Sequence, residues 1–239
     1  MTHPHVTPAL IGLDADDTLW HNEPLFRMTH ARFDSLLQPW ADSATVAAHL
    51  AQVEHRNLHV YGYGAKGFTL SMMETALELS QGQAAASVLA EILQAGRELM
   101  LHPMEPLPGV PAALERLARV APLVLVLVTK GDLFHQESKL AASGLGSFFH
   151  GVEIVSEKTA DTYRRAFRRH GSAPEVALMA GNSVRSDILP ALDAGSQAAL
   201  IPYPLVWCHE AAEVPNGHPR FAQFDSLGAL ADWLEAAVR

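Results

Sequence analysis

Two long apolar runs constrain the fold more than any other feature of this chain. Residues 9–13 and 122–128 are apolar without alternating polar positions, which is typical of strands buried on both faces of a sheet. Shorter apolar runs follow at 151–155, 176–180 and 198–201. Helix-like stretches accompany these later runs, at 109–120, 136–143, 160–170 and 186–194. Strands that alternate with helices predict an α/β fold with a doubly wound, mostly parallel sheet covered on both faces.

The stretch from about residue 24 to 103 breaks this alternation. Its apolar spacing predicts successive helices and no strong strand, with helices expected at 24–37, 43–53, 70–79 and 83–100. A run of helices inside a strand-helix alternation indicates an inserted all-helical subdomain, and the alternative is extra helical layers on one continuous core. We therefore divide the chain into an α/β core of residues 1–22 and 104–239 and a helical insert of residues 23–103. An amphipathic helix is expected to close the chain at 227–238.

Composition excludes several classes of protein. The formal net charge of −9 disfavours nucleic acid or an anionic membrane surface as a partner. Hydrophobic residues make up 49% of the chain and charged residues only 18%, so we expect a large core and little disorder. The single cysteine, Cys208, excludes an intramolecular disulfide and a multi-thiolate zinc site. Because no export signal or membrane-spanning run is evident, we expect a cytoplasmic protein whose oligomeric state the sequence leaves open.

Acidic residues follow the first apolar run directly. Asp14, Asp16 and Asp17 are succeeded by Thr18, at the position where the first strand should end. In an open parallel sheet, the carboxyl ends of the strands form the ligand crevice. Carboxylates packed together repel one another unless a cation is bound, and hard oxygen ligands select magnesium or calcium. The alternative interpretation is a solvated turn that caps a helix.

Polar residues also follow the next three apolar runs. Thr129 and Lys130 end the second run, where a hydroxyl and turn amides can hold a phosphate oxygen. Lys158 follows the third run, and the fourth is followed by Asn182 and Asp187, an amide oxygen and a carboxylate. Taken singly, each has a structural explanation: a helix N-cap for Thr129, a surface position for Lys158, a first-turn acid for Asp187. Their recurrence after successive strands indicates one shared site.

The order of these motifs resembles the haloacid dehalogenase superfamily. Its four motifs match residues 9–202 in order, as Asp14-x-Asp16-x-Thr18, a strand ending in Thr129, then Lys158, and the segment 181–187. The stretch 129–149 also looks like the helix that follows the second motif in this superfamily. The resemblance implies a Rossmann-like core. It also implies that the helical insert between the first and second motifs is a cap, which many members carry over the site.

The resemblance implies a phosphatase that hydrolyses a small phosphorylated metabolite with the aid of Mg²⁺. Asp14 would be the nucleophile that forms an aspartyl-phosphate, and Asp16 would be the general acid and base. The metal would be held by Asp14, the main-chain carbonyl of Asp16, and Asn182 or Asp187. The phosphate-binding candidates are Thr18, Thr129, Lys130 and Lys158. The dehalogenases that name the superfamily lack an acid at the position of Asp16, so phosphate chemistry is favoured.

One position departs from the superfamily pattern. The first fourth-motif residue is often acidic, and here it is Asn182, so we expect magnesium to bind more weakly than at an all-acidic site. Two alternative functions stay open at this point. One is a phosphotransferase or phosphomutase that uses the same aspartyl-phosphate, and the other is a catalytically weak relative that only binds its ligand.

Substrate-specificity candidates come from two segments. His21 and Asn22 closely follow the first motif, where we expect the chain to leave the core, so they are candidates to face the substrate. The alternative is that they pack against the core or act as a hinge. Tyr61, Tyr63 and Lys66 lie among three glycines, which suits a mobile loop that closes on a polar substrate. The alternative for this second segment is a plain interhelical loop.

Overall fold

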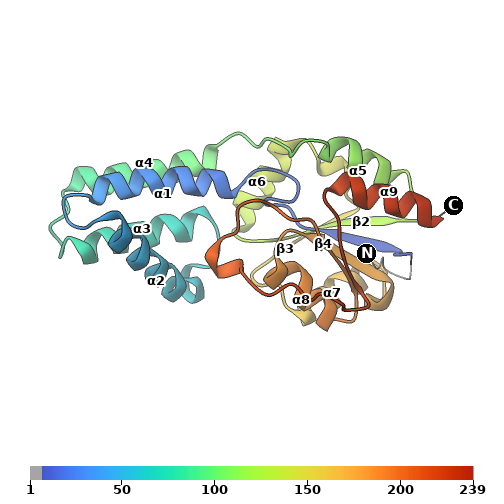
Figure 1. Cartoon of the computed structure of the whole chain (residues 1–239). Helices are drawn as coiled ribbons and strands as arrows, with labels where there is room; N and C mark the ends of the chain where they lie inside the picture. Colours follow the sequence, from blue (N-terminus) through green and yellow to red (C-terminus); the bar gives the residue numbers. More distant parts are fainter. Residues whose placement is uncertain (1–6, 239) are drawn as a thin grey trace. The chain divides into compact units, whose positions relative to one another are not determined.

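The computed structural model describes residues 7–238, and its largest feature is one parallel sheet (Figure 1). The strands are β1 (Leu10–Leu13), β2 (Val124–Lys130), β3 (Gly151–Val155), β4 (Ala177–Gly181), β5 (Gln197–Leu200) and β6 (Phe221–Gln223). They are hydrogen-bonded in the order β3-β2-β1-β4-β5-β6, and each of these pairs is parallel. The predicted α/β fold with a doubly wound sheet is therefore confirmed.

The central strands are buried because helices cover both faces of the sheet. β1 lies between β2 and β4, with Leu10 opposite Val124 on one side and Ala177 on the other. In Figure 1, α5 (Val110–Ala118) and α9 (Leu227–Val238) lie on one face, while α7 (Ala160–Arg169) and α8 (Leu189–Asp193) lie on the opposite face. This two-sided cover explains why these strands have continuous apolar runs instead of an alternating pattern.

Three local differences from the sequence expectations bear on the site or the sheet. The edge strand β6 was not predicted, because three residues are too few to give a periodic signal. Helix α6 (Leu133–Ser143) begins before the expected residue 136. The single helix expected at 186–194 is a π-helical turn, η3 (Val184–Ile188), followed by α8. Single π-turns inside helices are frequent at functional sites.

The chain divides into two compact units. One unit contains the sheet and is formed by the residues up to His21 together with those from Met104 onward. The other, Asn22–Pro103, is helical, with α1 (Glu23–Leu37), α2 (Ser43–Tyr61), α3 (Ala65–Leu79) and α4 (Ala86–Leu101). Its apolar core includes Phe33, Leu50, Met72 and Ile92. No helix among residues 7–238 combines the length and the apolarity that a membrane crossing requires.

The glycine-rich segment of the helical unit is shorter than the predicted loop. Tyr61 ends α2 and Lys66 already belongs to α3, so the connection is confined to residues 62–64. Gly62 and Gly64 have φ angles of +70° and +104°, which residues with a Cβ atom rarely adopt. A Cβ atom at Gly67 would lie 2.7 Å from the carbonyl oxygen of Gly62. The glycines thus form a tight turn between two helices, and the prediction of a loop over the whole segment is wrong.

Candidate active site

A buried network of three charges lies at the end of β1. The Lys158 Nζ atom is 2.5 Å from Asp14 Oδ1 and 2.7 Å from Asp187 Oδ1. All three side chains are almost fully excluded from solvent. Burial and the nearby Asp187 raise the pKa of Asp14, although Lys158 opposes this shift. Burial works against the charge of Lys158, but the two carboxylates outweigh it and raise the pKa of Lys158, so the lysine stays protonated.

Thr18 connects the first motif with the fourth. Its hydroxyl donates to Asp14 Oδ2 at 3.0 Å and accepts the backbone N–H of Asn182 at 3.1 Å. The side-chain oxygen of Asn182 lies 3.4 Å from the same hydroxyl. Thr18 therefore brings two hard oxygen donors together, the second oxygen of Asp14 and the amide oxygen of Asn182.

Asp187 has both carboxylate oxygens engaged. Oδ1 contacts Lys158, and Oδ2 accepts the backbone N–H of Ser183 at 2.9 Å. Gly181 makes this placement possible, because a Cβ atom there would overlap the Asp187 carboxylate and lie 2.9 Å from Asp14 Cβ. The arrangement directs Asp187 toward Lys158. Of the two fourth-motif candidates for a metal ligand, only Asn182 is placed beside the second oxygen of Asp14 by a shared contact.

The donor atoms at this strand end fit a hard cation. Among residues 7–238, no group of three or more His, Cys, Asp or Glu side chains is placed to hold a metal ion. A cation here would therefore depend on amide and main-chain carbonyl oxygens in addition to the Asp14 carboxylate. The charge balance favours such a cation, because two carboxylates share a single lysine. Oxygen donors of this kind suit magnesium or calcium better than zinc or copper.

The Asp16 carboxylate contacts Trp20 and two side chains of α6. Lys139 Nζ lies 2.9 Å from each of its carboxylate oxygens. Trp20 Nε1 donates to Oδ1 at 2.7 Å, and Gln136 Nε2 donates to Oδ2 at 3.1 Å. Burial by itself would raise the pKa of Asp16, but these contacts, led by Lys139, outweigh burial and lower it. Asp16 is therefore ionised in this arrangement.

The sequence analysis missed Gln136 and Lys139. Both lie on α6, and together with His135 they are the buried residues of this helix. Leu133 and Phe134, at the start of the same helix, are 59% and 67% exposed. This helix therefore buries polar side chains and exposes apolar ones. A polar stripe on the inner face, in a helix that directly follows a motif strand, is the signal that would have found them.

Thr129 and Lys130 end β2 and have different surroundings. Thr129 is buried, and its hydroxyl accepts a hydrogen bond from Gln136 Nε2 at 2.7 Å. Lys130 Nζ lies 2.6 Å from Glu210 Oε1, so its charge is paired with a carboxylate. The phosphate-binding role of Lys130 stays a prediction, and this pairing disfavours it.

Glu210 belongs to η4 (Cys208–Glu210), in the loop that follows β5. Besides Lys130, its carboxylate accepts hydrogen bonds from the hydroxyls of Ser183 and Ser186. Burial would raise the pKa of Glu210, but Lys130 and the two serines outweigh burial and lower it. No periodic pattern or motif marks this residue in the sequence.

The predicted substrate-specificity residues are distributed over both units. His21 belongs to the sheet unit, where its Nδ1 lies 2.7 Å from the hydroxyl of Tyr203 in the loop after β5. Asn22, Tyr63 and Lys66 belong to the helical unit. Tyr61 belongs to it too, and its hydroxyl donates to Glu74 at 2.8 Å. Their roles toward a substrate stay predictions.

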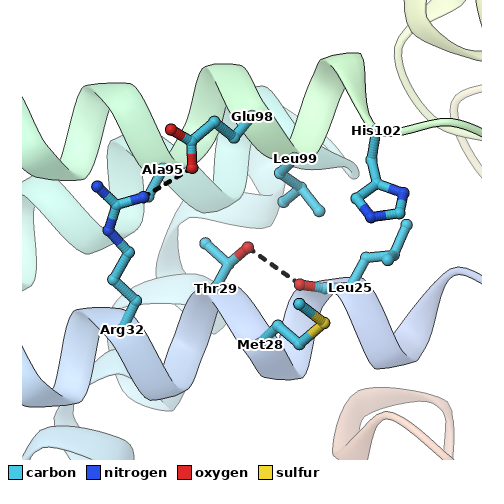
Figure 2. Close-up of a pocket in the computed structure, with 8 residues that line it drawn as sticks. All are labelled: Leu25, Met28, Thr29, Arg32, Ala95, Glu98, Leu99 and His102. Atoms are coloured by element: carbon cyan, nitrogen blue, oxygen red, sulfur yellow. Dashed lines mark hydrogen bonds and ion pairs between the residues drawn. The ribbon is translucent and has the colours of Figure 1, made fainter.

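The helical unit has a cavity of about 250 Å³ between α1 and α4 (Figure 2). Its polar side chains have partners close by. Arg32 pairs with Glu98 at 2.7 Å, and the Thr29 hydroxyl donates to the Leu25 carbonyl at 3.0 Å, as Figure 2 shows. None of the predicted site residues lines this cavity. We therefore place the candidate active site in the sheet unit.

The parallel sheet, with acids and a lysine at its strand ends, places this protein in the α/β class. Comparison with known proteins gives its family. The model of the haloacid dehalogenase-like hydrolases matches residues 8–195. This chain therefore belongs to the haloacid dehalogenase-like hydrolase family. A comparison with curated proteins gave no match.

Solved structures agree with this assignment. A haloacid dehalogenase-like family hydrolase from Xanthomonas campestris is 37% identical, with a TM-score of 0.84 over 100% of this chain and 96% of that chain. A predicted phosphoglycolate phosphatase from Haemophilus somnus is 18% identical, with a TM-score of 0.65 over 98% and 99%. L-2-haloacid dehalogenase from Xanthobacter autotrophicus is 17% identical, with a TM-score of 0.62 over 95% and 98%. For the last two, the similarity shows the fold alone.

Proposed function

We propose that this hydrolase is a magnesium-dependent phosphatase that acts on a small phosphorylated metabolite through an aspartyl-phosphate. The observation that carries the proposal is the carboxylate of Asp16, two residues after Asp14 and held in place by Lys139. An alkoxide leaving group needs a proton, and a water nucleophile must lose one, so phosphate ester hydrolysis uses an acid-base group. A halide leaves without a proton. Asp16 therefore favours phosphate esters over haloacids as substrates.

In the first step, a carboxylate oxygen of Asp14 forms a bond to phosphorus while the bond from phosphorus to the ester oxygen breaks. Asp16 gives its proton to that leaving oxygen. In the second step, Asp16 takes a proton from water, whose oxygen attacks phosphorus. Inorganic phosphate is released, and the Asp14 carboxylate is restored. The first step requires the protonated form of Asp16, and the ionised form described above is the one that the second step requires.

Lys158 and Thr129 are proposed to bind the non-bridging oxygens of the phosphoryl group. An ammonium group has three N–H donors, and Lys158 directs two of them at Asp14 and Asp187. The third is left for an anionic ligand. The Thr129 hydroxyl accepts from Gln136, which leaves its own proton to donate. Donors fixed before the substrate binds stabilise the charge of the transition state without further reorganisation.

Asp14, the main-chain carbonyl of Asp16, and Asn182 are proposed to hold Mg²⁺. When bound, the ion would offset the repulsion between the Asp14 carboxylate and the phosphate. Asp187 would act on Lys158, because both of its oxygens are engaged. The neutral side chain of Asn182 implies weaker metal binding than an all-acidic set would give.

Phosphate release from an aryl phosphate in the presence of Mg²⁺ tests this function. We expect turnover by the wild-type protein, none by Asp14→Asn, and turnover lowered about 100-fold or more by Asp16→Ala. Halide release from 2-chloropropionate without phosphate release would contradict the proposal and favour dehalogenation. Interconversion of two sugar phosphates without net phosphate release would instead identify a phosphomutase.

A further inference from the structure

Helix α6 has a buried lysine, Lys139, whose ammonium group needs a partner of opposite charge. Lys139 is only 6% exposed, and Gln136, one turn earlier on the same face, is 3% exposed. Removing an ammonium group from water is unfavourable unless an opposite charge and hydrogen bonds replace the solvent. The Lys139 ammonium pairs with the Asp16 carboxylate. The helix therefore brings a fixed positive charge to Asp16.

The contacts around Asp16 fix the rotation of its carboxylate. Lys139 spans both oxygens at 2.9 Å, Trp20 donates to Oδ1, and Gln136 donates to Oδ2. Each oxygen thus accepts two hydrogen bonds, which uses its lone pairs. Rotation about the side-chain torsions would break several contacts at once. Asp16 is consequently held in one orientation before any substrate binds.

Gln136 links this carboxylate to the rest of the site. Its Nε2 atom also lies 2.7 Å from the Thr129 hydroxyl oxygen and 3.0 Å from the Lys130 carbonyl oxygen, so its two N–H groups are shared among three acceptors. Its Oε1 atom is buried and has no hydrogen-bond partner, which is unfavourable for an amide oxygen. Gln136 therefore connects the Asp16 carboxylate to Thr129 and Lys130 at the end of β2.

We propose that Lys139 and Gln136 are positioning residues for proton transfer by Asp16. The proposal rests on the phosphatase function above. Lys139 fixes the orientation of the Asp16 carboxylate and stabilises the negative charge that remains once its proton has gone to the leaving oxygen. Gln136 holds the Asp16 carboxylate in a fixed position relative to the Thr129 hydroxyl. Both residues act through Asp16, and neither is proposed to contact the substrate.

Two substrates separate positioning from general damage to the site. An alkyl phosphate needs a proton on its leaving oxygen, whereas 2,4-dinitrophenyl phosphate has a leaving group stable without one. The ratio kcat/KM reports substrate binding and the steps up to the first irreversible one, so it includes leaving-group departure but not the later hydrolysis of the aspartyl-phosphate. With Mg²⁺ present, we expect Lys139→Met to lower kcat/KM for the alkyl ester about 100-fold, within the range of acid-base catalysis. For the dinitrophenyl ester we expect a change of less than about threefold.

Further variants act as controls. Lys139→Arg keeps the charge and should restore part of the loss, and Gln136→Met should show the same leaving-group pattern in weaker form. Glu137→Met removes a charge from the exposed face of α6 and should resemble the wild type. When Lys139→Met is added to the Asp16→Ala variant, kcat/KM should not change further for either ester. The reason is that Asp16, through which Lys139 acts, is no longer present. Thermal unfolding checks the fold of each variant. If Lys139→Met does not fold, the two single variants Lys139→Arg and Gln136→Met test the inference instead.

Equal losses on both esters, no loss, or a gain in activity would overturn the inference while leaving the phosphatase function intact. An additive loss in the double variant would also overturn it. If the wild-type protein releases phosphate from neither ester under any divalent metal, the proposed function fails, and the inference fails with it.

Discussion

Asp14 Oδ1 and Lys158 Nζ lie 2.5 Å apart at the carboxyl end of β1, with both side chains buried. The two residues are 144 positions apart in the chain. Their contact ties the end of β1 to the segment after β3, and Asp187 adds the turn after β4. One lysine therefore fixes three strand ends at the point where the proposed chemistry occurs.

Replacing Lys158 should destabilise the protein more than replacing Asp14. Lys158→Met leaves two buried carboxylates without a counter-charge, which costs about 3–5 kcal/mol of unfolding free energy. Asp14→Asn keeps the pair of Lys158 with Asp187 and should change the unfolding free energy by about 1 kcal/mol or less. Denaturant unfolding at pH 7 measures both. Equal destabilisation by the two variants would show that the network does not depend on the lysine charge.

Asn182→Asp should tighten magnesium binding. The substitution adds a carboxylate beside the second oxygen of Asp14, so we expect the dissociation constant to fall about tenfold, a change of roughly 1.4 kcal/mol. It should also destabilise the metal-free protein, because a third carboxylate then shares one lysine. Calorimetric titration with Mg²⁺ and thermal unfolding with and without the metal provide the measurements. Unchanged or weaker binding would remove Asn182 from the proposed metal ligands.

Glu210→Gln should loosen the loop between β5 and β6. The substitution leaves the charge of Lys130, whose side chain is only 11% exposed, without its nearest carboxylate and weakens the contacts to Ser183 and Ser186. We expect a destabilisation of about 2 kcal/mol and faster proteolytic cleavage within residues 202–220. Glu213→Gln, an exposed position in the same loop, is the matched control. If the two variants are cleaved at the same rate, Glu210 does not anchor the loop.

The stability of the helical unit should depend on Glu54 in α2. Burial, with a contribution from nearby Glu23, raises the pKa of Glu54 to about 7. A carboxyl group with a raised pKa in the folded state stabilises the fold when it is protonated. That contribution is complete below the usual pKa of about 4.5 and is lost as the pH rises to about 7.

Glu54→Gln should therefore stabilise the protein at pH 8 and have little effect at pH 4.5. We expect a gain of at most about 3 kcal/mol at the higher pH, from 1.4 kcal/mol per pKa unit. Glu91→Gln removes an exposed partner of Arg32 and should have a small effect at both values. Thermal unfolding of the two variants across this range provides the comparison. A gain from Glu54→Gln that does not vary with pH would contradict the titration of this group.

The sheet could be predicted from the sequence because the pattern of apolar residues along a strand is a local signal. The runs at 9–13 and 122–128 became β1 and β2, since a strand covered on both faces must be apolar at every position. The polar residues after each run marked the strand ends, and the Asp14-x-Asp16-x-Thr18 pattern marked the family. The sequence did not predict where α3 begins. Residues 65–68 are helical, because Gly62 and Gly64 complete the turn between α2 and α3 within three residues.

The contacts that shape the site were decided only by the tertiary structure. Lys139 lies 123 positions from Asp16, and Glu210 lies 80 from Lys130. A lysine on a helix and a glutamate in an irregular loop look like ordinary surface residues in a sequence. Whether such a charge is solvated or buried depends on which distant carboxylate or ammonium group the folded chain brings beside it. The sequence by itself therefore determined the fold class and the strand-end motifs, whereas the pairing of distant charges followed from the path of the folded chain.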